Sequence, residues 1–437
     1  MSFTRYPEYE DTELDWFREI PKSWAIRKLN GIADVLAGYS FNSDSFCSNG
    51  IPVIRMSDFG KGQIFQENAK FVPAESVPIS AFGKEEDILL GLSGSIGNFA
   101  VIKKNDLPVA INQRVAIIRS TSKWRDLLPW LLQSIEFKIQ IESQLPATTI
   151  QNISMEQLRK VVFPIPPNEK IVQKITEFLI NETAKIESLI TEQEKLISLL
   201  KEKRQAVISH SATKGLDTKV NMKDSGVEWL GDVPEHWDLS KGRNIFKIKK
   251  RIVGELGYDV LSITQKGIRI KDIESNEGQL SMDYSKYQLV EIGDFAMNHM
   301  DLLTGYVDLS KFNGVTSPDY RVFSIQNKDT CYPEYFLYLL QNGYSNKIFY
   351  PYGQGSSQLG RWRLPTEEFK EFCYPLPSID EQKKIASFIS KETKKMDALI
   401  YESNQGIQLL QERRSALISA VVTGQIDVRN YQSKEAA

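Results

Sequence analysis

The chain has 437 residues, of which 41% are hydrophobic and 25% are charged. This length suffices for two or three domains with separate hydrophobic cores, and the composition excludes a disordered or fibrous protein. The formal net charge of −2 neither demonstrates nor excludes a polyanionic partner, although nucleic-acid-binding chains are usually more basic.

The cysteines and the N-terminus indicate where the protein works. Cys47, Cys331 and Cys373 are odd in number and form no CxxC pair, so we expect reduced thiols. The N-terminal stretch MSFTRYPEYEDTELDW contains acidic residues and a proline where a signal peptide has an apolar core. No run approaches the ~20 apolar residues of a membrane-spanning helix. We therefore expect a soluble, cytoplasmic protein.

The first long block, residues 25–160, has the pattern of short strands separated by turns. The stretches IPVIRMSDFGKGQIF, DILLGLSGSIGNFAVIKK and VAINQRVAIIRS contain β-rich runs interrupted by Gly, Asn and Ser, and LLPWLLQSI (127–135) predicts a helix. Asp87 precedes one of these strands, where we expect it to form a turn. The stretch GLSGSIGN (91–98) lacks the GxxxxGK[ST] pattern of a phosphate-binding loop, so it predicts a turn-rich loop.

A long helix is predicted after FPIPP (163–167), because prolines end the preceding strand just before the helix begins. It would span about 40 residues, or ~60 Å. Alternating steps of four and three residues follow a mostly apolar seam, and this 3.5-residue period predicts a coiled coil. The seam consists of Ile175, Leu179, Glu182, Ile186, Leu189, Gln193, Leu196, Leu200, Lys203 and Val207.

The second part of the chain has the same order. DSGVEWLGDVPEHW (224–237) repeats DTELDWFREIPKSW (11–24), and residues 238–370 again predict strands, turns and a helix at YPEYFLYLL (332–340). Asp294 precedes a strand, as Asp87 does. A second long helix follows YPLP, and we expect Gly406 on its seam to mark a close approach or a local irregularity. This seam consists of Ile385, Ile389, Glu392, Met396, Leu399, Ser403, Gly406, Leu410, Arg413 and Leu417.

The chain is therefore a duplication. The closing stretch KEKRQAVISHSATKGLD (201–217) recurs about 210 positions later as QERRSALISAVVTGQID (411–427), whereas the two variable blocks are not obviously alike. This order predicts an α+β fold with two globular domains joined by two long antiparallel coiled-coil helices in a pseudo-twofold arrangement. The expected globular domains are 1–160 and 218–370, and the expected helical parts are 161–217 and 371–437. The alternative is two separate core helices, one in each domain.

The sequence offers no catalytic or metal-ligating set of residues. Only three histidines are present, and His210 and His299 lack partners at metal-ligand spacing. His236 lies in the duplicated opening stretch, but Ser23 replaces it in the first copy. No NPPY or DPPY stretch of adenine methyltransferases occurs. We expect a chain without catalytic residues, metal or bound cofactor.

Polar side chains on the Gly-rich loops instead suggest contacts with DNA. Arg recognises guanine and Asn or Gln recognises adenine through paired hydrogen bonds, while Ser, Thr and Lys bind phosphates. In the first block the candidates are Arg55, Ser57, Lys61, Ser93, Ser95, Asn112, Gln113, Arg114, Thr148, Thr149, Gln151 and Asn152. In the second they are Thr264, Gln265, Lys266, Arg269, Lys271, Asn298, Tyr306, Tyr320, Arg321, Ser356, Ser357, Gln358, Arg361 and Arg363.

The repeated stretches carry a family resemblance. DSGVEWLGDVPEHW, PLPSIDEQKKIASFI and ERRSALISAVVTGQID resemble the conserved regions of the DNA-specificity subunits of type I restriction–modification systems. YPEYEDTELDWFREIPKSW and KEKRQAVISHSATKGLD look like degraded copies of the same regions. The resemblance covers the whole chain in order, but it transfers no base-contacting residue, because the variable blocks diverge within the family.

The resemblance implies a non-catalytic subunit that binds double-stranded DNA through two target-recognition domains, each contacting one half of a split, asymmetric sequence. It also implies two methyltransferase subunits and further restriction (motor–nuclease) subunits as partners, which would bind S-adenosylmethionine, ATP and Mg. Two other hypotheses remain at this point. One is a fused methyltransferase–recognition enzyme, which would need the missing methyltransferase motif. The other is a coiled-coil adaptor that binds only proteins.

Overall fold

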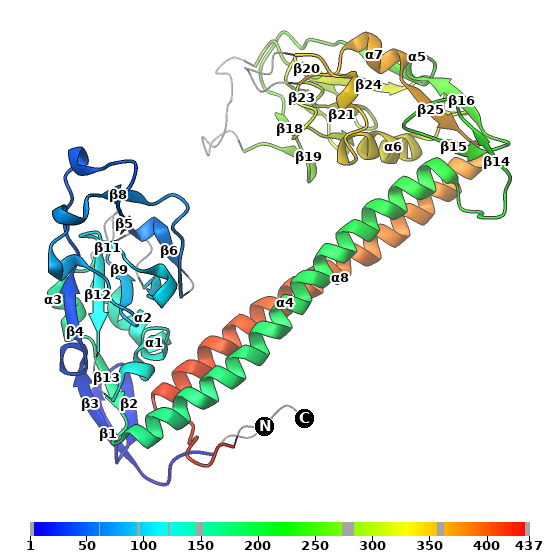
Figure 1. Ribbon diagram of the computed structural model, residues 1–437. Helices are drawn as coiled ribbons and strands as arrows, with labels where there is room; N and C mark the ends of the chain where they lie inside the picture. The colour runs from blue at the N-terminus through cyan, green and yellow to red at the C-terminus, as the bar shows by residue number, and fades with distance from the viewer. Residues whose placement is uncertain are drawn as a thin grey trace. The chain divides into compact units, whose positions relative to one another are not determined.

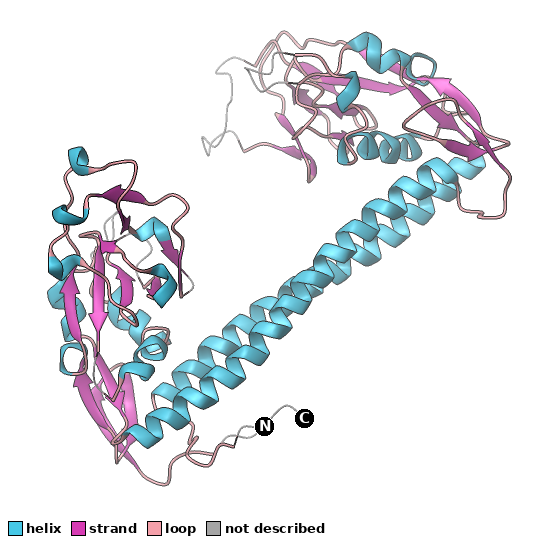
Figure 2. Cartoon of the chain, viewed as in Figure 1, coloured by secondary structure: helices cyan, strands magenta, loops and turns pink. Residues whose placement is uncertain are grey.

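The computed structural model describes residues 4–60, 62–93, 97–120, 123–145, 152–272, 284–355 and 362–432 (Figure 1). The chain forms two compact units, Met1–Gln193 with Gln405–Ala437, and Glu194–Asn404. Both units combine helices with strands, so the predicted α+β class is confirmed (Figure 2). No helix within the described ranges is long and apolar enough to cross a membrane.

The first unit is built around a four-stranded antiparallel sheet in the order β10–β9–β12–β4. A smaller sheet has the order β11–β5–β8, in which β5 runs parallel to β11. Two-stranded pairs are β1–β2, β13–β3 and β6–β7. The strands are β1 (Tyr9–Leu14), β2 (Phe17–Pro21), β3 (Ala25–Lys28), β4 (Asp34–Ala37), β5 (Ile51–Ile54), β6 (Phe59–Gly60), β7 (Gln63–Ile64), β8 (Lys70–Val72), β9 (Ile88–Gly91), β10 (Phe99–Val101), β11 (Ala110–Ile111), β12 (Val115–Arg119) and β13 (Val162–Ile165). Its short helices are α1 (Leu128–Leu131), α2 (Ile135–Glu142) and α3 (Met155–Lys160).

The second unit has the antiparallel sheet β17–β24–β21–β22 and the pairs β18–β19, β20–β23, β14–β15 and β16–β25. The strands are β14 (Met222–Asp224), β15 (Asp232–Pro234), β16 (Asp238–Lys241), β17 (Phe246–Lys249), β18 (Leu261–Thr264), β19 (Gly267–Ile270), β20 (Gln288–Val290), β21 (Phe295–Met297), β22 (Val307–Leu309), β23 (Gly314–Thr316), β24 (Arg321–Ile325) and β25 (Cys373–Leu376). Its shorter helices are α5 (Gly242–Ile245), α6 (Pro333–Ser345) and α7 (Thr366–Glu371).

The two variable blocks share one sheet topology although their sequences look unrelated. In the first, the pairing of β12 with β9 aligns Val115 with Gly91. In the second, β24 aligns Arg321 with Met297, and both residues lie 206 positions later. The duplication therefore includes the four-stranded sheets of the blocks as well as the scaffold around them.

A buried aspartate occupies the same turn in both units. The backbone amide of Lys84 donates to Asp87 Oδ2 at 2.8 Å, and the amide of Glu291 donates to Asp294 Oδ2 at 3.1 Å. Each carboxylate is almost fully buried, directly before β9 or β21. The predicted turn-forming role of both aspartates is confirmed.

The long helices α4 (Glu169–Lys214) and α8 (Ile379–Val422) lie side by side and antiparallel (Figure 1). The first unit contains the ion pair Arg414–Glu187 at 2.8 Å, and the second contains Arg204–Asp397 at 3.0 Å. The residue numbers of both pairs add up to 601, so both halves of the helix pair have the same antiparallel register. This excludes the alternative of two separate core helices.

The apolar positions of the predicted seam are buried or half-buried, except for three leucines. Ile186, Leu200 and Met396 are buried, as expected. The predicted Ile175, Leu179, Ile385 and Ile389 are also buried, where they join the cores of the globular parts. Val207, Leu410 and Leu417 are half-buried.

Leu189, Leu196 and Leu399 are the wrong positions, because 46%, 43% and 47% of these side chains are exposed. Ile190 and Ile197 are buried instead, and Ile400 is half-buried. Each misplaced leucine precedes an isoleucine, so either order of three- and four-residue steps gives an apolar seam in the sequence.

The expectation for Gly406 was also wrong. A Cβ built at Gly406 would meet no atom within 4 Å, and α8 continues through this residue as regular helix. The glycine therefore marks neither a close approach nor an irregularity.

The repeated closing stretches pack against the repeated opening stretches. After α4, Gly215 has a φ of +79° and lies against Trp237, and after α8, Gly424 has a φ of +76° and lies against Pro21 and Trp24. Glycine adopts this left-handed conformation at a helix C-terminus without steric cost. A Cβ at Gly424 would lie 2.5 Å from Pro21 Cγ. The opening and closing stretches recur together because each closing stretch packs against one opening stretch.

Candidate nucleic-acid-binding surfaces

A cavity of about 960 Å³ in the first unit brings together all seven described candidate residues of that block. The loops after β5 and β11 position five of them, while Ser93 follows β9 and pairs with Asn152, which precedes α3. Because β5 and β11 are parallel neighbours, their carboxyl ends lie at one edge of the sheet, where α/β folds commonly bind ligands. The candidates that line the cavity are Arg55, Ser57, Ser93, Asn112, Gln113, Arg114 and Asn152.

Arg55 is held in place by a buried acid. Its Nε donates to Asp58 Oδ2 at 2.8 Å, and its Nη2 donates to Asp58 Oδ1 at 3.0 Å and to the carbonyl of Asn68 at 2.9 Å. Ser57 Oγ also donates to Asp58 Oδ1, at 2.8 Å. Most donors of Arg55 are thus already used, which leaves its Nη1 for a ligand.

The loop after β11 presents side chains that are still available. The amide of Arg114 donates to Asn112 Oδ1 at 3.2 Å, and the amide of Gln113 donates to the carbonyl of Tyr39 at 2.9 Å. These bonds fix the backbone of the turn. The side chains of Gln113 and Arg114 are exposed, and no hydrogen bond or ion pair to them occurs among the described residues.

The cavity also contains residues that the sequence analysis missed. Phe41 and Phe46 form part of its wall, and Lys70 Nζ lies 5.1 Å from the centre of the Phe46 ring. An aromatic wall beside basic groups is typical of nucleic-acid-binding surfaces. These residues lie on separate strands and loops, so no local motif identified them.

In the second unit, Thr264, Gln265 and Lys266 form the turn between β18 and β19. Thr264 Oγ1 donates to the carbonyl of Gly267 at 3.0 Å and accepts from the amide of Lys266 at 3.1 Å. The side chains of Gln265 and Lys266 are exposed, as is Arg269 on β19. Lys271 follows β19, where its amide donates to the carbonyl of Val260.

Arg321 is a correction to the predicted DNA-binding surface, because only 4% of the residue is exposed. Its Nη2 donates to the carbonyl of Leu364 at 3.1 Å and to Thr366 Oγ1 at 3.3 Å, and its guanidinium lies 4.7 Å from the centre of the Phe369 ring. Burial disfavours the charge and lowers the pKa of Arg321 to about 10. This side chain holds loops to the sheet and is not presented to an external ligand.

Three further candidates of the second block, Asn298, Tyr306 and Tyr320, are half-buried. Tyr306 and Tyr320 pack against the hydrophobic cluster of β18, β19 and β24, and burial raises the pKa of both phenols. The Asn298 carbonyl accepts a hydrogen bond from Tyr344 Oη at 2.7 Å. Arg363 is exposed, and its backbone pairs with Gln354.

Nine candidates lie outside the described residues. These are Lys61, Ser95, Thr148, Thr149, Gln151, Ser356, Ser357, Gln358 and Arg361.

The histidines occupy three different environments. Burial is the main reason why the pKa of His299 falls to about 3, and the nearby Arg321 charge adds to this effect. His236 Nε2 lies 3.1 Å from Glu381 Oε2, and His210 is exposed. Across the described ranges, no cluster of three or more His, Cys, Asp or Glu residues could hold a metal ion.

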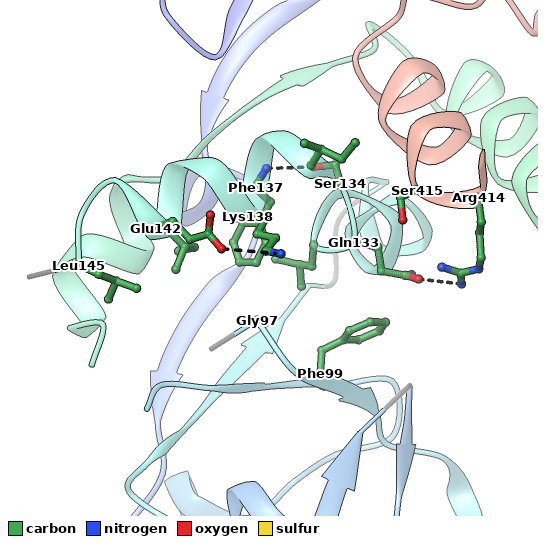
Figure 3. A pocket seen from close by; sticks show the side chains of 13 residues that line it. Gly97, Phe99, Gln133, Ser134, Phe137, Lys138, Glu142, Leu145, Arg414 and Ser415 are labelled. Carbon is green, nitrogen blue, oxygen red and sulfur yellow. Dashed lines mark hydrogen bonds and ion pairs between the residues drawn. The ribbon is translucent and has the colours of Figure 1, made fainter. Parts of the chain in front are cut away.

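A second cavity, of about 510 Å³, lies where α2 meets the C-terminal part of α8 (Figure 3). Arg414 Nη2 donates to Gln133 Oε1 at 3.0 Å, and the amide of Ile135 donates to Ser419 Oγ at 2.8 Å. Arg414 also pairs with Glu187 of α4. These contacts attach the first variable block to both long helices within its unit.

Comparisons with known proteins agree with this architecture. The family model of the type I restriction modification DNA specificity domain matches residues 21–198 and 234–409. The EcoBI specificity subunit, from a type I restriction enzyme of Escherichia coli, is 23% identical over 452 aligned positions, which cover 98% of this chain and 91% of that protein.

Two solved structures have a similar fold. The HsdS subunit from Thermoanaerobacter tengcongensis has a TM-score of 0.51 at 13% identity, covering 93% of this chain and 98% of that one. A chain from a structural study of complex assembly and conformational transition of the type I R-M system has a TM-score of 0.63 at 13% identity, covering 92% and 98%. The chain therefore belongs to the family of type I restriction–modification DNA specificity subunits, with two copies of the family's domain.

Proposed function

We propose that this subunit recognises a bipartite, asymmetric sequence in double-stranded DNA, with each globular part contacting one half. The main support is that two blocks with the same four-stranded sheet carry different exposed side chains. Gln113 and Arg114 are presented in the first block, and Lys266 and Arg269 in the second. Two domains with the same framework but different contact residues are suited to recognise two half-sites of different sequence.

The helix pair would also bind two methyltransferase subunits, one for each copy of the scaffold. Exposed leucines support this proposal, because they are duplicated with the 210-residue period. Leu189 corresponds to Leu399, and Leu199 corresponds to Leu409, and all four are exposed. Exposed apolar side chains that recur on a duplicated scaffold suit two copies of one partner.

The chain itself would be non-catalytic and would work in the cytoplasm. Under this proposal, S-adenosylmethionine is bound by the methyltransferase subunits, and ATP and Mg by the restriction subunits. The support is that the exposed candidate residues carry hydrogen-bonding side chains, which suit recognition of base edges and phosphates.

The test is to express the chain with its methyltransferase subunits in a host without other DNA methylation and to sequence the methylated bases of the genome. We expect a split motif with N6-methyladenine in each half. A complex that assembles but yields no split motif would contradict the proposal. The competing adaptor hypothesis predicts that Arg114→Ala with Arg269→Ala leaves assembly and DNA binding unchanged, whereas we expect assembly without sequence-specific methylation.

A further inference from the structure

We infer that one loop, occurring once in each globular part, carries the base-recognising side chains: Gln113 and Arg114 between β11 and β12, and Asp319 between β23 and β24. The inference rests on the proposed function and specifies it. It assigns purine recognition to the loop of the first part and recognition of a cytosine amino group to the loop of the second.

Strand pairing shows that the two loops are equivalent. In the first unit, Ala110 pairs in parallel with Val53 and antiparallel with Phe82. In the second unit, Val315 makes the same two pairings, in parallel with Val260 and antiparallel with Leu289. Val53 and Phe82 both lie 207 positions before their counterparts.

The end of each loop is also matched, because β12 and β24 begin at corresponding positions of the four-stranded sheets. The residues between these fixed points are 112–114 in the first unit and 317–320 in the second. The two loops therefore connect equivalent strands: β11 to β12 in the first unit and β23 to β24 in the second.

The first loop offers hydrogen-bond donors in a concave site. The exposed Gln113 and Arg114 line the cavity of about 960 Å³, and their backbone is fixed by Asn112 and Tyr39. Arg donates two hydrogen bonds to guanine, and Gln pairs with the N6 and N7 atoms of adenine. Both side chains therefore suit purines.

The second loop is equally well fixed but offers acceptors. The buried Gln288 donates through Nε2 to the carbonyls of Ser317 and Tyr320, at 2.9 and 2.6 Å. The amide of Asp319 donates to Ser317 Oγ at 3.3 Å. The Asp319 side chain is exposed, and it forms no hydrogen bond or ion pair with another described residue.

An unpaired carboxylate on a DNA-binding loop restricts what the loop can contact. It repels phosphates, so its position is favourable only where a base edge supplies a donor. The exocyclic amino group of cytosine is the donor that Asp and Glu accept from in the major groove. Asp319 was overlooked in the sequence because only the strand pairing identifies its loop as the counterpart of residues 112–114.

The experiment compares methylated motifs of the complete methyltransferase complex carrying Arg114→Ala or Asp319→Asn. The matched controls are Arg18→Ala and Asp329→Asn, which change exposed residues of the same units outside the two loops. We expect Asp319→Asn to relax discrimination at one base of one half-site by roughly tenfold. Arg114→Ala should relax the opposite half-site, while both controls retain the wild-type motif.

The outcomes separate the inference from the proposed function. A wild-type complex without a split motif contradicts the proposed function. A split motif that both loop variants leave unchanged, or variants that alter the same half-site, overturns the inference alone. If a loop variant abolishes methylation, the purified complex is used to select duplexes from a random pool. One relaxed base in one half-site then supports the inference, and an unaltered selected motif overturns it.

Discussion

Two buried aspartates illustrate how single residues maintain a fold whose loops diverge. Asp87 is neutralised by Arg119, whose Nε donates to Asp87 Oδ1 at 2.8 Å. Its counterpart Asp294 pairs with Lys249 at 2.6 Å and with Arg251. The cation comes from β12 in the first unit and from β17 and the residues after it in the second. The carboxylate and its turn are kept, while the source of the positive charge differs.

Removing this cation should destabilise the first unit. We expect Arg119→Ala to lower the free energy of unfolding by about 3 kcal/mol, because it leaves a buried carboxylate unpaired. Arg125→Ala, which breaks an exposed ion pair with Glu86, should cost less than about 1 kcal/mol. Urea denaturation of both variants measures their free energies of unfolding. Equal losses of this free energy would refute the importance assigned to the buried ion pair.

His299 should make the second unit sensitive to acid. Its folded pKa of about 3 lies below the ordinary value of 6.5, so the unfolded chain binds a proton first as the pH falls. The stability associated with the neutral ring is complete above pH 6.5 and decreases by about 1.4 kcal/mol per pH unit toward pH 3. Urea denaturation between pH 7 and 4 should show a shallower pH dependence for His299→Asn than for wild type. The exposed His210→Asn is the control, and parallel curves for all three proteins would disprove the prediction.

At the scale of elements, the long helices show the limits of a periodic pattern. The sequence contains the pairs Leu189–Ile190 and Leu196–Ile197, and either member of each pair continues a 3.5-residue period. The antiparallel partner selects the isoleucines, which are buried, and leaves the leucines exposed. Propensity does not distinguish the two choices, because the decision depends on the rotation of α4 about its own axis against α8.

This assignment can be tested with neighbouring substitutions. We expect Ile190→Ala to lower the free energy of unfolding by roughly 2–4 kcal/mol, since it removes buried methyl groups and leaves a cavity. Leu189→Ala should lower it by only about 1 kcal/mol, because nearly half of this side chain is already exposed. The pair Ile197→Ala and Leu196→Ala provides a repeat of the comparison. If chemical denaturation shows a larger loss of unfolding free energy for the leucine variants than for the isoleucine variants, the seam predicted from the sequence is correct after all.

At the scale of the whole molecule, α4 and α8 both contribute to each compact unit, so their length is predicted to set the spacing of the two half-sites. Inserting one heptad at matched positions of both helices keeps the antiparallel register. It adds about 10 Å of helix, or roughly three base pairs of unread DNA. Methylation sequencing should show a longer spacer between unchanged half-sites. An altered half-site would contradict the separation between recognition and spacing.

Partner binding is expected to depend on the duplicated leucines. Replacing Leu199 with Lys should weaken binding of one methyltransferase subunit, and adding Leu409→Lys should weaken the second. Both side chains are exposed, so the isolated chain should keep its stability. Native mass spectrometry of the assembled complex counts the bound subunits. A full complement of subunits with the double variant would exclude these leucines as contacts.

The sequence by itself determined the duplication, the α+β class, the two long helices and the turn-forming aspartates. These features depend on local patterns: repeated stretches, prolines before a helix, a 3.5-residue period and an acid before a strand. It also identified Asn112, Gln113 and Arg114 as candidates, because consecutive polar residues between two apolar strands indicate an exposed turn.

Only the tertiary structure decided which candidates are accessible and which are interior. Arg321 and Gln113 are both residue types that commonly contact DNA bases. Arg321, however, is buried at the start of a central strand beneath packed loops, whereas Gln113 lies on a loop and lines the cavity of the first unit. The equivalence of the loops at Arg114 and Asp319 was likewise absent from the sequence. It follows from pairings between strands far apart in the chain, and the free energy that fixes such pairings depends on burial and backbone hydrogen bonding rather than on residue identity in the loop.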